Sequence, residues 1–344
     1  MSIKKLAFTF LIVIVAGGGL LAQSAKLKRA TALMEKLDYI GAIEQLNQIL
    51  EKDDVAEAKL LIAEAYRKIS DSENAEFWYG QVVRLPEAEA EHKLFYGQAL
   101  QRNGKCELAK EWYAQYVDER PDDLRGQYLM KACDYEEELR TKNAGIYEVT
   151  NLEFNSNLDD FSPLYYKDGL VFASERDQGA AIRRTHVWTG HPFLELFKVK
   201  MDEAEGEECG NYTFGVPEKM AKDVNSKFHD ASMTFNSDQT KVIFTRNNFL
   251  KGKTGKSDDG IVKLKIYMAD VVGDKWENME GLPFNSDEYS VAHPTLSQDG
   301  NRLFFSSDMP GGFGGMDLYL SEKENGRWGP PMNLGPTINT EGNE

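Results

Sequence analysis

The sequence predicts an α + β multidomain protein, in which an N-terminal α-solenoid is followed by an incomplete β-propeller. Helix-forming sequence repeats with a period near 34 residues in the first part of the chain, and such a period is typical of stacked helix pairs. After the composition changes near Gly145, blocks of about four short strands repeat, which is the plan of a propeller blade. These observations divide the chain into a signal peptide at 1–22, a solenoid at 25–142, a linker at 143–150 and propeller repeats at 151–344.

The first residues have the pattern of a secretory signal peptide. Lys4 and Lys5 precede an apolar run of 17 residues that ends at Ala22. A basic start, a short apolar core and a small exit residue predict cleavage after Ala22 and export to the periplasm. An uncleaved membrane anchor is the alternative, although a span needs about 20 apolar residues. No Cys lies near the exit, so the sequence predicts no lipoprotein acceptor there.

The charge balance excludes several classes of partner. The chain carries 40 Lys and Arg against 56 Asp and Glu, a formal net charge of −16. Binding to nucleic acids and to anionic lipid surfaces depends mainly on Lys and Arg. We therefore predict no nucleic-acid partner and no docking onto anionic lipid.

The helical part contains three segments that align without gaps around an alanine. These alanines are Ala42, Ala75 and Ala109, and the large residues four positions later are Leu46, Tyr79 and Tyr113. A small side chain lets two helices approach closely, and the large residue one turn later fills the space beside it. The segments "DYIGAIEQLNQIL", "DSENAEFWYGQVV" and "GKCELAKEWYAQYV" closely resemble tetratricopeptide repeats, followed by a capping helix. This resemblance implies a concave face that binds peptides or proteins, and an unrelated helical bundle is the alternative.

The three cysteines fall in different surroundings. Cys106 opens the last predicted repeat helix and Cys133 lies in the capping helix expected to pack on it. In an oxidising periplasm the two could form a disulfide, and two buried free thiols are the alternative. Cys209 lies in an acidic loop and is predicted to remain a free thiol.

The second part of the chain repeats an Asn followed by Ser or Thr. The motif occurs at Asn155, Asn225, Asn285 and Asn339, in steps of 70, 60 and 54 residues. Between these positions the same order of strands and polar turns recurs, which favours propeller blades over the alternative of a β-sandwich. We interpret the final stretch, "NLGPTINTEGNE", as the start of a fourth blade, and expect the natural protein to continue beyond it.

The third block resembles the TolB-like (WD40-like) propeller repeat. The match covers "SQDGNRLFFSSDMPGGFGGMDLY" and includes Asp299, Gly300 and Asp317. The first two blocks depart from it, with Glu195 and Lys265 at the position of Asp317, and rest on strand order instead.

Several motifs suggest chemistry that their context does not support. "GKTGKS", at 252–257, has Leu250 where a phosphate loop needs its first Gly. "GGFGG" is not followed by a helix, as a dinucleotide site requires. The five His, including His186 and His191, lack metal-ligand spacing, and no G-x-S-x-G nucleophile elbow occurs. We predict no catalytic residue, cofactor-binding residue or metal ligand, and no cofactor.

The order of signal peptide, tetratricopeptide repeats and TolB-like propeller resembles the OmpA family of the Bacteroidetes cell envelope, including PorE-like components of the type IX secretion system. The resemblance implies a non-enzymatic scaffold at the outer membrane, linked to peptidoglycan by a C-terminal OmpA-like domain that these residues lack. Envelope or secretion proteins would be its partners. One alternative is a propeller that senses peptides or glycans at the outer membrane, and another is an enzyme with its catalytic domain beyond residue 344.

Overall fold

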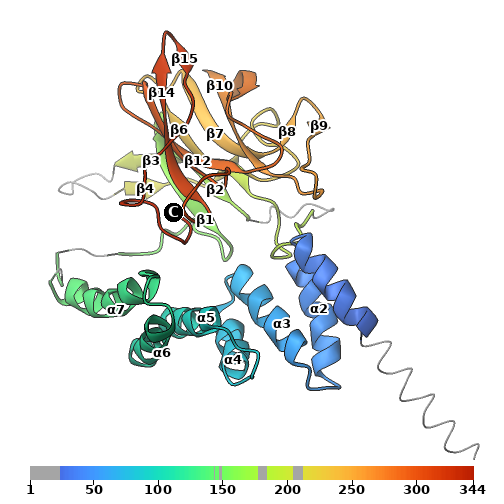
Figure 1. The fold of residues 1–344 in the computed structure, drawn as a ribbon. Helices are drawn as coiled ribbons and strands as arrows, with labels where there is room; N and C mark the ends of the chain where they lie inside the picture. The colour runs from blue at the N-terminus through green and yellow to red at the C-terminus, as the bar shows by residue number, and fades with distance from the viewer. Residues whose placement is uncertain (1–23, 143, 147–148, 177–183, 204–211) are drawn as a thin grey trace, which may run out of the picture. The chain divides into compact units, whose positions relative to one another are not determined.

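The computed structural model describes residues 24–142, 144–146, 149–176, 184–203 and 212–344. The predicted signal peptide and Cys209 lie outside these residues. The chain forms two compact units, a helical unit of Met1–Glu148 with His186–Gly190 and a β unit of Val149–Thr185 with His191–Glu344. Figure 1 shows helices α2 to α7 and the strands of the β unit. Within the described residues, none of the helices has the length and apolar character needed to cross a membrane.

The helical unit is a chain of helices in which each packs against the next. After a helix over residues 24–35 come α2 (Tyr39–Leu50), α3 (Ala56–Lys68), α4 (Ser72–Val82), α5 (Ala90–Arg102), α6 (Cys106–Glu119) and α7 (Arg125–Lys142). Asp38 and Asp71 cap α2 and α4, because their carboxylates accept the backbone N–H of Gly41 and Asn74. Such caps satisfy amides that have no partner inside the helix.

The aligned residues of the three repeats form the helical core. Ala42, Ala75 and Ala109 are buried, and so are Leu46, Tyr79 and Tyr113. The packing is closest between α5 and α6, where a Cβ on Gly97 would lie 2.5 Å from the Tyr113 ring. Glycine at this position allows the ring of Tyr113 to lie directly on the α5 backbone.

Gly97→Ala is expected to destabilise the helical unit, although alanine favours helices by about 1 kcal/mol. The buried Tyr113 ring cannot move aside freely, and overpacking of this kind costs about 1–3 kcal/mol. Urea denaturation monitored by circular dichroism measures the change. Gly80→Ala in α4 is the matched control, because its Cβ would meet only the hydroxyl end of Tyr96, at 3.1 Å. Equal stabilities of the two variants would contradict the prediction.

The β unit contains three larger antiparallel sheets. Sheet 1 has the order β1-β2-β3-β4, with β5 also paired to β3, and consists of β1 (Asp160–Tyr166), β2 (Gly169–Ser174), β3 (Glu195–Glu203), β4 (Tyr212–Phe214) and β5 (Glu218–Lys219). Sheet 2 has the order β11-β10-β7-β6 and consists of β6 (Asp230–Phe235), β7 (Lys241–Asn247), β10 (Leu264–Val272) and β11 (Lys275–Gly281). Sheet 3 has the order β12-β13-β14-β15, with β16 also paired to β14, and consists of β12 (Val291–Leu296), β13 (Arg302–Ser307), β14 (Asp317–Glu324), β15 (Arg327–Trp328) and β16 (Met332–Asn333). A separate hairpin joins β8 (Phe249–Leu250) and β9 (Lys253–Thr254).

The first strand of every sheet carries a bulge at the same place. The register shifts between Phe161 and Leu164 in β1, and correspondingly in β6 and β12. The bulged residues Ser162, Ser232 and His293 all have positive φ. The repetition seen in the sequence is therefore also a repetition of backbone geometry.

Alternating side chains of the strands bury two cores between neighbouring sheets. Leu196 of sheet 1 and Phe244 of sheet 2 belong to one core. Ile243 and Ile266, on the other side of sheet 2, pack with Phe305 of sheet 3 in the second core. Sheet 2 is thus covered on both faces, as its continuous apolar strands require.

The recurring Asn residues fasten the turn after each sheet to that sheet's third strand. The amide of Asn225 accepts from Leu196 N at 2.7 Å and donates to Leu196 O at 3.1 Å. Asn285 makes the same two bonds with Ile266, and Asn339 with Leu318. We call this arrangement the Asn clamp. It replaces a neighbouring peptide group, so that the strand's N–H and C=O are both satisfied.

The last ten residues pack on sheet 3. Besides the Asn339 clamp, Gly315 N donates to Gly342 O at 2.6 Å, and Glu344 N donates to Met316 O at 2.8 Å. In this structure "NLGPTINTEGNE" therefore completes sheet 3. The fourth blade expected from the sequence stays a prediction.

Candidate binding surfaces

The helical unit ends in a helix that is covalently joined to its neighbour. Cys106 at the start of α6 and Cys133 in α7 form a disulfide with a Cα–Cα distance of 5.8 Å. Of the two outcomes left open by the sequence, the structure has the bridge rather than two thiols. It fixes α7 on α6, where Leu129 and Met130 make the apolar contacts.

The opposite side of α7, together with Leu124 directly before its first residue, exposes a row of large apolar side chains. Leu124, Tyr128, Tyr135 and Leu139 lie at i, i+4, i+11 and i+15, which places them within an arc of about 60° on a regular helix. We call these four residues the α7 stripe. Tyr128 and Tyr135 are 56% and 57% exposed, and a shallow groove of about 480 Å³ runs between them. Clustered exposed apolar side chains are typical of protein interaction sites.

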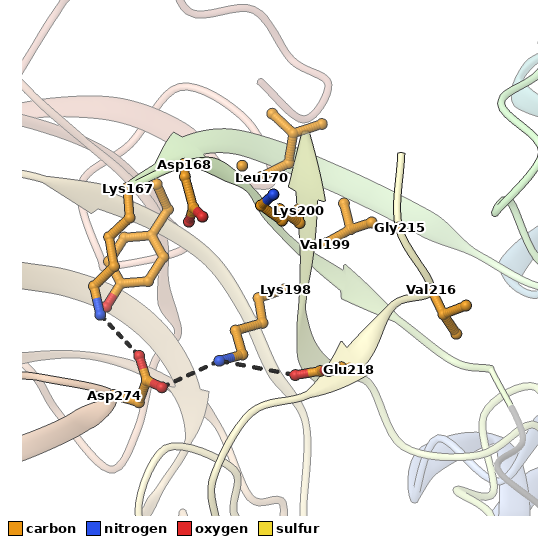
Figure 2. Close-up of a pocket in the computed structure, with 12 residues that line it drawn as sticks. Lys167, Asp168, Leu170, Lys198, Val199, Lys200, Gly215, Val216, Glu218 and Asp274 are labelled. Atoms are coloured by element: carbon orange, nitrogen blue, oxygen red, sulfur yellow. Dashed lines mark hydrogen bonds and ion pairs between the residues drawn. The ribbon is translucent and has the colours of Figure 1, made fainter. Parts of the chain in front are cut away.

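A second surface is a cleft of about 420 Å³ in the β unit. The turn between β1 and β2 supplies Lys167, β3 supplies Lys198 and Lys200, and the turn between β10 and β11 supplies Asp274. We call it the charged cleft. Figure 2 shows the Asp274 carboxylate between the amines of Lys167 and Lys198, at 2.8 and 3.1 Å. Val199 and Val216 add apolar side chains to its lining.

The ion pairs favour the charged forms of Lys167, Lys200 and Asp274 in the charged cleft. The hydrogen bond to Asp274 raises the pKa of Lys167, and Asp202 raises the pKa of Lys200. Lys167, and then Lys198, lower the pKa of Asp274. A lysine nucleophile or a carboxylate general base needs shifts in the opposite directions. The cleft is therefore suited to binding by charge.

The two glycine-containing motifs that were rejected as phosphate or dinucleotide sites form a hairpin and a loop. The "GKTGKS" stretch runs through the β8–β9 hairpin, where Gly252 has φ +80°, and no helix follows it. The "GGFGG" stretch forms a loop in which Phe313 N and Gly314 N donate to the Asp317 carboxylate. Neither stretch presents backbone amides at a helix N-terminus, which is the arrangement that a phosphate loop and a dinucleotide fingerprint use.

The histidines are not arranged as metal ligands. His191 contacts Glu175 at 3.0 Å, and His186 contacts Thr189 at 3.0 Å. No group of three or more His, Cys, Asp or Glu side chains suited to a metal occurs among the described residues.

Sequence reasoning identified the cysteine pair and the Asn repeat but missed both surfaces. The α7 stripe has a detectable signal, because four large apolar residues share one face of a helix already assigned as a cap. The charged cleft has no such signal, since Lys167, Lys198 and Asp274 lie up to 107 residues apart in the sequence. Only the pairing of strands brings them together.

Comparisons with known proteins give limited information. No family model matches the chain, and no curated protein matches it. A crystal structure of MamA is 21% identical with a TM-score of 0.31, over 35% of this chain and 71% of that one. The tetratricopeptide-containing C-terminal domain of a Plasmodium falciparum FK506-binding protein is 17% identical with a TM-score of 0.31, over 35% and 91% of the two chains. A puromycin-hydrolysing peptidase of Mycobacterium tuberculosis is 14% identical with a TM-score of 0.30, over 52% and 24%. The resemblance to the OmpA family stays a prediction.

Proposed function

We propose that this protein is a non-enzymatic scaffold that holds partner proteins in the cell envelope. The α7 stripe carries the proposal, because it offers exposed aromatic side chains on a helix held rigidly by a disulfide. Aromatic residues dominate the energetics of protein interfaces. The ion-paired state of the charged cleft supports the absence of catalysis.

The envelope location rests on the signal-peptide pattern and on the resemblance to the OmpA family. In this proposal the partners are other envelope or secretion proteins, bound by the helical unit and the β unit. A link to peptidoglycan would be made by an OmpA-like domain rather than by either unit.

A photo-crosslinking amino acid at Tyr128 or Tyr135 tests the role of the α7 stripe in the native cells. We expect one discrete crosslinked species, identified by mass spectrometry, from both positions. The matched control is Phe77 in α4, which is 60% exposed but lies outside the stripe. Equal crosslinking from Phe77, or none from the stripe, would contradict the proposal.

The charged cleft supports a second candidate function, the binding of an acidic peptide or an acidic glycan by the β unit. Three lysine amines at the edge of a cleft of this size could receive carboxylates if Asp274 gave up its pairs. The test is titration of the full chain with acidic peptides and uronic-acid oligosaccharides by calorimetry. Lys198→Met should abolish any saturable binding, whereas Lys256→Met, in a distant loop, should leave it unchanged.

A further inference from the structure

The four Asn-Ser/Thr motifs form four copies of one turn. In each, the Ser or Thr hydroxyl accepts a hydrogen bond from the backbone N–H two residues later. The accepting hydroxyls are those of Ser156, Ser226, Ser286 and Thr340, and the donors are the N–H groups of residues 158, 228, 288 and 342. The Asn N–H donates to the carbonyl three residues back in the turns of Asn155 and Asn285, and to the carbonyl four residues back in those of Asn225 and Asn339. All four Asn side chains are therefore presented by similarly ordered backbone.

Three of these turns have a strand to clamp and the first does not. Asn225 and Asn339 are 7% and 2% exposed, and each brackets one residue of a third strand. Asn155 is exposed, and its side chain makes no hydrogen bond within the described part of the chain. The side-chain amide of Asn155 is held by the same kind of turn as the other three, but it has no third strand to bind.

The apolar residues of this first turn show the same difference. Leu152 and Phe154 precede Asn155 as Leu282 and Phe284 precede Asn285. Leu282 is 4% exposed in the core between sheets 2 and 3, whereas Leu152 is 37% exposed. Phe154 packs on Phe172 of its own sheet, at a centroid distance of 5.5 Å. The side of this turn that would face a preceding sheet is uncovered.

The other end of the β unit lacks the complementary neighbour. The residue before the clamp Asn packs on the following sheet in two turns, where Val224 is 0% and Phe284 is 7% exposed. Ile338 occupies this position in the last turn and is 48% exposed. Sheet 3 thus presents the interface that receives a next sheet, and the first turn presents the interface that receives a previous one.

A second copy of this chain does not fit the free clamp. A clamp needs a third strand with one aliphatic residue whose N–H has no other acceptor, whereas the C=O of each clamped residue also accepts a backbone N–H. In every copy Leu196, Ile266 and Leu318 are already bracketed by Asn225, Asn285 and Asn339. The fitting strand belongs to a sheet that has no Asn turn of its own after it.

We propose that the turn at Leu152, Phe154 and Asn155 is a docking site for the third strand of a further antiparallel sheet of this plan, one without a following Asn turn. The interface continues the pattern already made twice between sheets 1, 2 and 3. The Asn155 amide would bracket one Leu or Ile of that strand, and the first added sheet would cover Ile338.

The first measurement is side-chain amide hydrogen exchange of the full chain, by NMR with labelled asparagine. We expect the amides of Asn225, Asn285 and Asn339 to be protected and that of Asn155 to exchange freely. Protection of Asn155 in this chain would overturn the proposal. If Asn155 is protected and its protection is lost on dilution, a second copy of the chain occupies the turn instead.

The second measurement supplies the missing strand. Glu344 is extended by one, two or three added sheets that repeat residues 291–344, the last of them ending at the position of Ile338. This gives about four to six sheets, the range in which such rings close. In at least one extended chain Asn155 should become protected, and Asn155→Ala should lower its Tm by about 4–8 °C. The same substitution should leave the Tm of the unextended chain unchanged, whereas Asn225→Ala should lower it.

A synthetic peptide of residues 316–326 provides a test that does not depend on folding of the extended chains. It contains the third strand of sheet 3 without its clamp, and should shift the Asn155 side-chain resonances saturably. The control peptide carries Leu318→Pro, which removes the N–H that the clamp accepts. The proposal is overturned if neither the peptide nor any extended chain affects Asn155.

Discussion

Arg246→Met is expected to lower the free energy of unfolding of the β unit by about 3–5 kcal/mol, because it leaves a buried carboxylate without its partner. Arg246 is 5% and Asp230 0% exposed, and the guanidinium Nε donates to that carboxylate. Its Nη2 also donates to Val224 O in the core between sheets 1 and 2. Both hydrogen bonds are lost in the variant, while the Asp230 carboxylate stays buried.

The loss of stability in Arg246→Met should depend on pH. Burial raises the pKa of Asp230 even though Arg246 opposes the shift, and removing Arg246 raises it further. Folding of the variant then takes up a proton, so its stability falls as pH rises above about 3.9, the unfolded pKa of Asp. We expect the difference from the natural chain to be larger at pH 7 than at pH 4, as measured by urea denaturation at both values.

Two variants separate the buried pair from general effects of charge. Asp230→Leu with Arg246→Met removes both charges and should recover most of the stability. Lys241→Met breaks an exposed pair with Asp270 and should change the stability little, because water screens such pairs. A loss in Arg246→Met no larger than that in Lys241→Met would show that the buried pair is not important for stability.

The sequence was sufficient to predict the helices because their determinants are local. The alanine at Ala42, Ala75 and Ala109 with a large residue four positions later predicts both the helix and its buried face. The strands could be predicted for the same reason, since "LVFAS" and "LFFSS" are short apolar runs that end in a small hydroxyl residue and lie between polar turns. Positions without a local pattern, such as the short β4 and β5, were missed because a neighbouring strand alone determines their pairing.

The Asn motif shows where local reasoning stops. Its spacing marked the repeats, but no local pattern pairs Asn225 with Leu196, 29 residues earlier. Read as the start of a block, the motif at Asn339 implied a blade to follow. In the structure the Asn339 amide binds the third strand of the preceding sheet, so the motif completes one repeat as well as starting the next.

Removal of the disulfide is expected to destabilise the helical unit by about 3.5 kcal/mol, as the chain-entropy account gives for a loop of this length. Cys106 and Cys133 are 27 residues apart, and α7 has few other fixed contacts because much of its surface is exposed. Urea denaturation of the chain with and without dithiothreitol measures the effect. The double variant Cys106→Ser with Cys133→Ser should match the reduced chain and not respond to reductant.

The same variant connects stability with the proposed function. If the disulfide holds α7 on α6, its loss lets the last helix fray and disperses Tyr128 and Tyr135 from a single face. Crosslinking from Tyr128 should therefore weaken in the double variant, while Arg140→Met, which breaks an exposed ion pair with Glu136 in the same helix, should leave it unchanged. Equal crosslinking in all three chains would mean that the partner recognises α7 without needing it fixed, and the disulfide would then matter for folding alone.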